Sequence, residues 1–380
     1  MSMTKEKKVT TSRQSNLELL RIIAMIMIIG HHYACHGGGY YYATQPLNVW
    51  ISCFFMIGGK IGVNAFILIT GYFMVQKKFD IHRLVKLELG VLFYSIVFFF
   101  VGVFVWREEL FQTLNLLTSL FPSVTNLYSN YWFIPCYLGV ILMAPFINKM
   151  ISVISRRQCK TMIIVLLIFT VFFPGLLATE GWYDGNIPVF FIMYLIGAYV
   201  RTYNKELCKG KVLPTALLAI GSYLLLWVLT SNLKLSTASG LADLLWCDYG
   251  ILTTVVAVFL FMTFKQMNIG SIRILNVISG ATLGIYLIHD NNYVRNYIWE
   301  KVFLCPQQFA SPTMWVHALK CIAIVFVVCT CIELVRSLIF KPLEYGLGKL
   351  PLRAKINDKF NGITDANEIS KDAYAQAKSE

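Results

Sequence analysis

The sequence predicts an all-α polytopic membrane protein with about ten transmembrane helices and both chain ends in the cytoplasm. Of the 380 residues, 57% are hydrophobic and only 14% are charged. Apolar runs recur from residue 17 to residue 340 and are separated by short polar loops. A helix of about 20 apolar residues is long enough to cross the ~30 Å hydrocarbon core of a bilayer. Composition and run length together therefore indicate a multi-pass protein.

Ten apolar runs are candidate spans. A polar leader at 1–16 precedes the first run and no small-residue cleavage site follows it, so we interpret this run as a retained anchor and not as a cleaved signal peptide. The membrane domain then covers 17–346, and the polar residues 347–380 are expected to form a flexible cytoplasmic tail. The expected spans are 17–36, 50–75, 84–106, 131–150, 161–178, 187–203, 212–231, 249–266, 275–294 and 315–338.

The basic residues that produce the net charge of +13 lie mainly in the loops. Basic residues concentrate in the leader and in every second loop, at 77–83, 149–160, 201–211 and 265–273, while the loops between them contain few. The loop at 295–314, with Arg295 and Lys301, fits this alternation least well. By the positive-inside rule, the alternation places both termini in the cytoplasm and requires an even number of spans, in agreement with ten. Topology accounts for the charge, so no nucleic-acid partner is expected.

Four basic side chains lie in the first span: Arg21, His31, His32 and His36. Such groups are costly inside a bilayer unless they face protein or water, so each is a functional candidate. Arg21 and His32 are eleven residues apart, which places them roughly 16 Å apart along a helix and on nearly the same face. One face would then carry a permanent cation near the cytoplasm and a titratable base in the opposite half of the membrane.

A structural role is the alternative for each of these side chains. Arg21 could extend to the lipid headgroups, and a histidine could be satisfied by a backbone carbonyl. His32 and His36 have the i, i+4 spacing of metal ligands, but no third ligand is evident nearby in the sequence, so no metal is expected. The ten cysteines include no C-x-x-C pair and are interpreted as small buried hydrophobes.

Five segments, in chain order, carry a resemblance to a known family. The first span has an arginine and, after ten intervening residues, a histidine. "GGKIGVNAFILITGYFM" (58–74) ends an apolar run in a Thr-Gly-Tyr-Phe turn that basic residues follow, and "NYWFIPCYLGVILMAPFIN" (130–148) leads from Trp-Phe to a proline and an asparagine. "FFIMYLIGAYV" (190–200) and "SGATLGIYLIHDN" (279–291) follow, the latter with a Tyr-Leu-Ile-His ending. Over roughly residues 16–340 the chain resembles the acyltransferase family 3 membrane proteins, which O-acylate bacterial cell-surface glycans.

The chain departs from the family pattern in two places. Many members carry a glutamate a few residues after the Trp-Phe segment, whereas "FIPCYLG" at that point contains no acid, so no catalytic carboxylate is assigned there. The arginine-rich stretch after the second span appears here as "KKFDIHRLVK", in which Lys78, Arg83 and Lys86 are only approximate matches.

The resemblance implies transfer of an acyl group from cytoplasmic acyl-CoA to a sugar hydroxyl on the far side of the membrane. Cations at the inner mouth would hold the CoA phosphates, and the candidates are Arg21, Lys78, Arg83 and Lys86. The catalytic candidates are His32 and His289. His32 would take the proton of the sugar hydroxyl or carry the acyl group itself, and the sequence does not separate these roles. His289 would support it, whereas Asp290 is a weaker candidate because adjacent residues on a helix point in different directions.

Four further residues are candidates for substrate binding. Gly58, Gly59 and Gly62 are expected to loosen the second span, so Lys60 and Asn64 would line the cavity that His32 faces. Close helix packing by the glycines, with Lys60 extended toward the headgroups, is the alternative. Tyr131 and Trp132 open the fourth span, where they would form an aromatic wall for a sugar ring or simply anchor the helix at the membrane interface.

The sequence therefore favours a membrane O-acyltransferase in the plasma membrane, most simply an O-acetyltransferase that uses acetyl-CoA. Its acceptor would be a cell-surface or capsular polysaccharide, or a lipid-linked glycan precursor. A polytopic transporter or glycan flippase is the alternative, although it has no need for the Arg21–His32 spacing and the cytoplasmic basic cluster, and paired broken helices would favour it. A glycan polymerase would be expected to carry a large outer loop, and none of the outer loops exceeds about two dozen residues.

Overall fold

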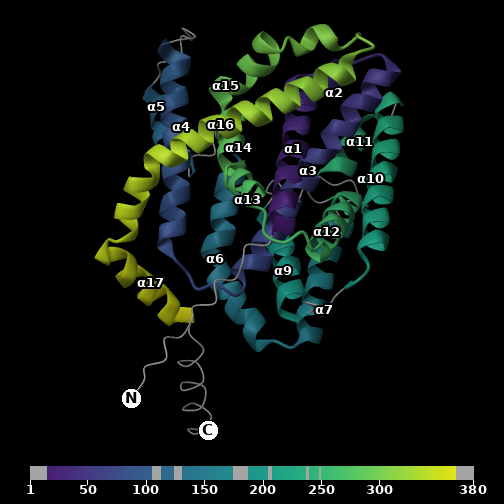
Figure 1. The fold of residues 1–380 in the computed structure, drawn as a ribbon. Helices are drawn as coiled ribbons and strands as arrows, with labels where there is room; N and C mark the ends of the chain where they lie inside the picture. Colours follow the sequence, from purple (N-terminus) through teal and green to yellow (C-terminus); the bar gives the residue numbers. More distant parts are fainter. Residues whose placement is uncertain are drawn as a thin grey trace, which may run out of the picture.

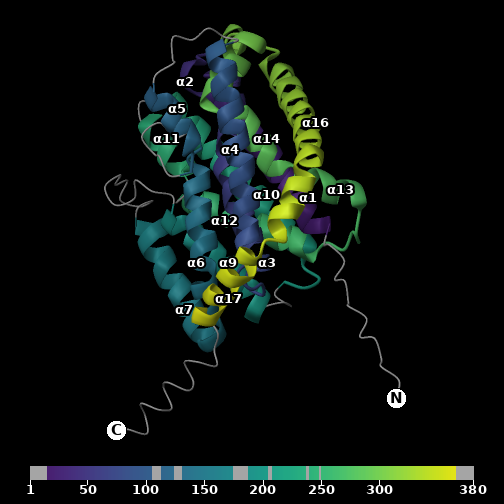
Figure 2. The same cartoon turned by 90° about the vertical axis from the view of Figure 1, so that its left-hand side faces the viewer.

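The computed structural model describes residues 15–104, 113–123, 131–173, 187–203, 208–236, 239–247 and 250–364. These residues contain helices and no strand. Figures 1 and 2 show the long helices packed side by side into a single bundle. The prediction of a helical membrane protein is confirmed, because many of these helices are long and apolar enough to cross a bilayer.

Seven helical stretches among the described residues meet the length and hydropathy of a membrane span. They correspond to seven of the ten predicted spans. They are α1 (Ser15–His36), α3 (Pro46–Met74), α4 (Ile81–Phe104), α6 (Phe133–Val153), α10 (Val212–Leu235), α16 (Met314–Gly348) and the stretch Ser239–Gln266, which contains α11 (Ser239–Trp246) and α12 (Ile251–Gln266).

The other three predicted spans fall on helices that are shorter than these seven among the described residues. Residues 187–203 form α9 (Ile187–Tyr203), and the ninth span is divided into α13 (Arg273–Gly280) and α14 (Thr282–His289). The fifth falls on α7 (Arg156–Leu167) and η1 (Ile168–Phe172), and its residues 174–178 lie outside the described part. The count of ten and the cytoplasmic location of the termini therefore stay predictions. The remaining elements are α2 (Gly39–Tyr42), α5 (Thr113–Leu120), α15 (Asn292–Asn296), η2 (Tyr297–Val302), η3 (Cys305–Gln308) and α17 (Pro351–Thr364).

Helices α1 and α3 form the centre of the bundle and are largely buried, whereas α10 exposes most of its length. Figure 1 shows α10 and α16 at the outside, with α1 and α3 between them. The exposed surface of α10 carries leucines on several sides, among them Leu213, Leu217 and Leu225. A helix that is apolar all round and exposed in the protein fits contact with lipid tails, while the polar residues of α1 and α3 face protein.

The expected interruption of the second span is wrong, because α3 is continuous through Gly58, Gly59 and Gly62. The glycines instead allow close packing: a side chain at Gly59 would collide with the ring of His31, and one at Gly62 with the Ala24 carbonyl of α1. Small residues are the usual means by which membrane helices approach closely. The break in this part of the bundle lies at Ala281, between α13 and α14.

Residues 351–364 of the expected flexible tail form α17, which packs against α4 and α6. Arg353 Nη2 lies 2.8 Å from Asp80 Oδ2. The ring of Phe360 stacks on Phe79 with centroids 4.3 Å apart. The Arg353 guanidinium lowers the pKa of the Asp80 carboxyl. The polar composition of α17 hid a helix that is anchored by an ion pair, by ring contacts of Phe360 with Phe79 and Phe146, and by hydrogen bonds of the Asn357 and Asn361 amides to the backbone of Ile81 and Phe79.

Replacing Asp80 by asparagine should loosen α17, because the variant keeps the size of the side chain and removes the charge that holds Arg353. We expect faster backbone hydrogen exchange over residues 351–364, measured by mass spectrometry on the purified protein. Lys355→Gln, on the exposed side of the same helix, is the matched control and should leave exchange unchanged. Equal exchange in wild type and Asp80→Asn would mean that the aromatic and amide contacts hold α17 without the ion pair.

Candidate functional site

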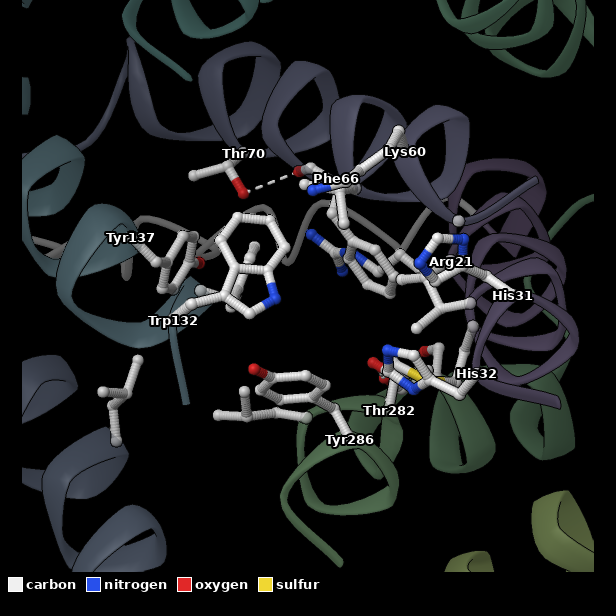
Figure 3. Close-up of a pocket in the computed structure, with 18 of the residues that line it drawn as sticks. Arg21, His31, His32, Lys60, Phe66, Thr70, Trp132, Tyr137, Thr282 and Tyr286 are labelled. Carbon is white, nitrogen blue, oxygen red and sulfur yellow. Dashed lines mark hydrogen bonds between the residues drawn. The ribbon is translucent and has the colours of Figure 1, made fainter. Parts of the chain in front are cut away.

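A cavity of about 310 Å³ lies among α1, α3, α6, α13 and α14. Figure 3 shows His31 and His32 from α1 at one side of it, with Trp132 and Tyr137 across from them. Arg21 also lines the cavity. Because α1 is an unbroken helix from Ser15 to His36, Arg21 and His32 are separated by roughly 16 Å along its axis. A single cavity therefore connects the two side chains that the sequence singled out.

Beside the Arg21 end of the cavity lies a buried carboxylate, Glu18, which was not among the residues predicted from the sequence. Arg21 Nη1 lies 2.8 Å from Glu18 Oε2, one helical turn earlier. The Ser279 hydroxyl donates to the same oxygen at 2.6 Å. Arg21 also lies 5.6 Å from the centre of the Phe73 ring. Its charge is thus paired inside the protein, and it does not simply extend to the headgroups.

At the other end, His32 and His289 are hydrogen-bonded to each other. His32 Nδ1 lies 2.8 Å from His289 Nε2, and His289 Nδ1 lies 2.6 Å from the Ile285 carbonyl oxygen. A carbonyl can only accept, so His289 Nδ1 carries a proton and donates. With both rings neutral, His289 Nε2 accepts from His32 Nδ1. The proton positions follow from this chain, which leaves a lone pair on Nε2 of His32.

His31 is held in a different way. Its Nδ1 lies 2.7 Å from the Met56 carbonyl oxygen of α3 and therefore donates to it. The ring packs directly over Gly59, where any side chain would collide with it. His31 also lines the cavity, so it combines a packing role between α1 and α3 with a ring nitrogen near His32.

Asp290 lies beside both His32 and His36, contrary to the weak role that the sequence gave it. Its Oδ1 is 3.7 Å from His32 Nε2 and 3.3 Å from His36 Nε2. Helix α14 ends at His289, so Asp290 leaves the helical path. Its side chain and that of His289 therefore both lie beside the His32 ring, one at each ring nitrogen. Arg295 Nη1 lies 3.4 Å from the same oxygen. This contact accounts for an arginine in the loop that fitted the charge alternation least well.

Lys60 and Trp132 meet at the wall of the cavity. Lys60 Nζ lies 4.1 Å from the centre of the Trp132 ring, within the range of a cation–π interaction. Both residues line the cavity, together with Tyr137 and Tyr286. The cavity thus combines a cation, aromatic rings and two histidines (Figure 3).

Asn64 and Tyr131 are fully buried and are not among the residues that line the cavity. The Tyr131 hydroxyl donates to the Leu287 carbonyl oxygen at 2.7 Å and accepts from Asn291 Nδ2 at 2.8 Å. Tyr131 therefore braces the end of α14 that carries His289 and Asp290. Its expected place in an aromatic wall falls instead to Trp132, Tyr137 and Tyr286.

The remaining basic candidates lie outside the cavity. Lys78 and Arg83 are exposed and line a small neighbouring pocket with Asp80 and Asn148. Lys86 Nζ lies 2.6 Å from Glu344 Oε2 of α16. Leu87 lines the cavity and follows Arg83 by one helical turn, so the pocket and the cavity are neighbours along α4.

The family model for an acyltransferase domain, Acyl_transf_3, matches residues 14–334. The chain belongs to this acyltransferase family. No curated protein and no solved structure matches it. The match confirms the resemblance drawn from the motifs and identifies the chain as a membrane acyltransferase. It favours the enzyme over the transporter.

Within this acyltransferase, the sequence analysis missed Glu18 and undervalued Asp290. Glu18 had a detectable signal, because it precedes Arg21 by three residues and such a pair shares one face of a helix. Asp290 had none, since its position depends on where α14 ends. Arg295 reaches Asp290 from the next helix, α15, which also could not be inferred from spacing.

Gly59→Ala should destabilise the acyltransferase and displace His31. The added methyl group would overlap the His31 ring, which must rotate away and lose its bond to Met56. Overpacking of this kind costs about 1–3 kcal/mol, and we expect a lower thermal unfolding midpoint of the detergent-purified protein. Gly139→Ala in α6 is the matched control, because no described atom lies within 4 Å of the added carbon. An unfolding midpoint in Gly59→Ala equal to that of Gly139→Ala would contradict the packing role.

Proposed function

We propose that this acyltransferase moves an acyl group, in the simplest case acetyl, from cytoplasmic acyl-CoA to a sugar hydroxyl of a cell-surface or capsular polysaccharide or of its lipid-linked precursor, at the plasma membrane. The observation that carries the proposal is the cavity that joins Arg21 to His32 across roughly 16 Å of α1. Donor and acceptor on opposite sides of a membrane require such a passage, because the thioester and the hydroxyl have to meet in one place.

The Arg21 end is proposed to receive the donor. At about 310 Å³ the cavity is at the small end of ligand sites. It therefore suits the acyl group and the flexible pantetheine arm of CoA better than a whole CoA molecule. The nucleotide and its phosphates would stay outside, near the exposed Lys78 and Arg83. Guanidinium and ammonium groups are the usual phosphate partners.

The histidine end is proposed to carry the chemistry. Nε2 of His32 accepts the proton of the acceptor hydroxyl while the hydroxyl oxygen attacks the thioester carbonyl carbon. The C–S bond breaks, and the CoA thiolate leaves and takes up the proton that His32 has accepted, so that His32 returns to its neutral form. The imidazolium formed on His32 is stabilised by Asp290 and by the bond from Nδ1 to His289. In the alternative order, Nε2 attacks the thioester first and the hydroxyl then removes the acyl group.

Aromatic side chains support a carbohydrate acceptor at this end. Trp132, Tyr137 and Tyr286 line the cavity across from the histidines. Flat apolar rings combined with a few polar groups are typical of pockets that orient a ligand. Lys60 is proposed to hold Trp132 in place through the cation–π contact and to offer a donor to the acceptor.

His32→Ala should lower transfer of labelled acetyl from acetyl-CoA into glycan by about 10²–10⁴-fold, the usual contribution of a general base. The measurement uses membrane vesicles that contain equal amounts of each variant and an added surface-glycan extract. His82→Gln, at the start of α4 and away from the cavity, is the matched histidine control. Transfer by His32→Ala at the wild-type rate would remove this residue from the mechanism.

The two orders of reaction are separated by omitting the acceptor. If His32 only takes a proton, labelled acetyl-CoA should leave no label on the protein after rapid denaturation. Label that is retained on wild type and absent from His32→Ala would show the covalent route instead. Absence of any transfer with authentic acceptor would contradict the proposed function as a whole.

A further inference from the structure

Three groups that bind metals converge at the histidine end of the cavity. His32 and His36 lie one turn apart on α1, and Asp290 follows α14. Each offers one ligand atom, and these three atoms all lie within 4.8 Å of one another. The sequence spacing indicated the two histidines, and the fold adds the carboxylate that was missing. His32 and Asp290 are buried, whereas His36 is partly accessible, which leaves a route for an ion to enter.

Two of the three separations between the ligand atoms are close to those around a tetrahedral ion, and the third, between the two histidine nitrogens, is no more than 4.8 Å. Zn²⁺ binds nitrogen and oxygen ligands at about 2.0–2.2 Å, so the ligand atoms of a tetrahedral site lie about 3.4 Å apart. Asp290 Oδ1 is 3.3 Å from His36 Nε2 and 3.7 Å from His32 Nε2. These two edges differ from the expected value by only a few tenths of an ångström, which small side-chain rotations supply. Two histidines and one carboxylate, with a fourth position for water, are a known zinc ligand set.

The surroundings of His32 are those of a metal ligand. A ligating histidine nearly always donates its other ring N–H to a fixed acceptor, which sets the tautomer and raises ligand basicity. His32 Nδ1 donates to His289, which in turn donates to the Ile285 carbonyl. The lone pair is therefore on Nε2, the nitrogen that faces Asp290. The arrangement that would prepare His32 to take a proton also prepares it to bind a cation.

The positive charge of Arg295 opposes a cation at this site. Its guanidinium lies 3.4 Å from Asp290 Oδ1 and also donates to Asn292 Oδ1 at 2.6 Å. A metal ion on Asp290 would compete with this contact and be repelled by the positive charge. Removal of the guanidinium should therefore tighten metal binding, whereas removal of a ligand should weaken it.

We propose that His32, His36 and Asp290 bind one Zn²⁺ ion, and that the bound ion inhibits acyl transfer because it occupies the Nε2 lone pair of His32. Binding itself does not depend on the proposed function, whereas the inhibition rests on it. The ion enters past His36, the most exposed of the three residues. Divalent metal on the side of the membrane from which His36 is accessible thus controls the rate of acyl transfer through this site.

Binding is tested without donor or acceptor. The full-length protein in detergent micelles is titrated with ZnCl₂ against a fluorescent zinc chelator, and bound metal is counted by elemental analysis after desalting. We expect one Zn²⁺ per chain. His36→Gln should weaken binding by at least about 10-fold, a loss typical even of residues that only orient a ligand. His36→Cys should bind, since a thiolate is a zinc ligand, and Arg295→Gln should bind more tightly.

His82→Gln is the control for a histidine outside the site, and size-exclusion profiles exclude misfolded variants. Equal affinity in wild type and His36→Gln would overturn the proposal, as would a wild type that binds no zinc. Inhibition is then measured as acetyl transfer relative to each variant's own metal-free rate, and it should follow zinc occupancy. Zinc binding with wild-type transfer unaffected by the metal would overturn the inhibition. Zinc binding in a protein that transfers no acetyl at all would leave the site intact and contradict the proposed function.

Discussion

The hydrogen bond between His32 and His289 is the interaction on which the site depends. It joins α1 to α14, which are more than two hundred residues apart in the chain, and it sets the tautomer of both rings. Buried polar groups in a membrane protein need partners inside the protein, and His32 Nδ1 and both nitrogens of His289 have them, while Nε2 of His32 keeps its lone pair. The Ile285 carbonyl ends the chain of donors. Tyr131, which lies just before α6, bonds to the Leu287 carbonyl and to Asn291 and so holds the end of α14 that carries His289. The position of α6 therefore bears on the position of His289 and, through it, of the His32 ring.

The same need for partners inside the protein explains why arginines of the bundle are paired. Arg21 has Glu18, Arg295 has Asp290, and Arg336 of α16 forms two short bonds to Glu333, which also accepts from Tyr94 of α4. A buried ion pair stabilises little by itself, but removal of one partner leaves a charge that has no compensation. Glu18 and Glu333 each also accept from a residue of another helix, so these two pairs contribute to how the helices meet. A count of cations along the sequence overstates the charge that is available to a ligand.

Hydropathy was enough to predict a bundle of apolar helices, because each long run forms a helix whatever its neighbours are. The Arg21–His32 spacing was also enough to predict that these two side chains share one side of the first helix, since both residues lie on one continuous helix. The prediction of a loosened second span failed because the glycines of α3 act on α1, across the helix interface, and this cannot be deduced from one helix alone. Asp290 was undervalued for a related reason: its direction depends on the end of α14. Residues 351–364 looked unstructured because their partners, Phe79 and Asp80, are remote in sequence.

The pairing of Arg21 with Glu18 also limits how a donor can bind. A phosphate that contacts Arg21 has to replace the Glu18 carboxylate, which still accepts from the Ser279 hydroxyl. Ser279 lies in the last turn of α13, two residues before the break at Ala281. The Thr282 hydroxyl at the start of α14 donates to the Ser279 carbonyl oxygen, so a movement of Ser279 would act on the helix that carries His289 at its other end. The two ends of the cavity are linked in this way through α14 as well as through α1, so occupation of the Arg21 end bears directly on the position of the reactive histidine.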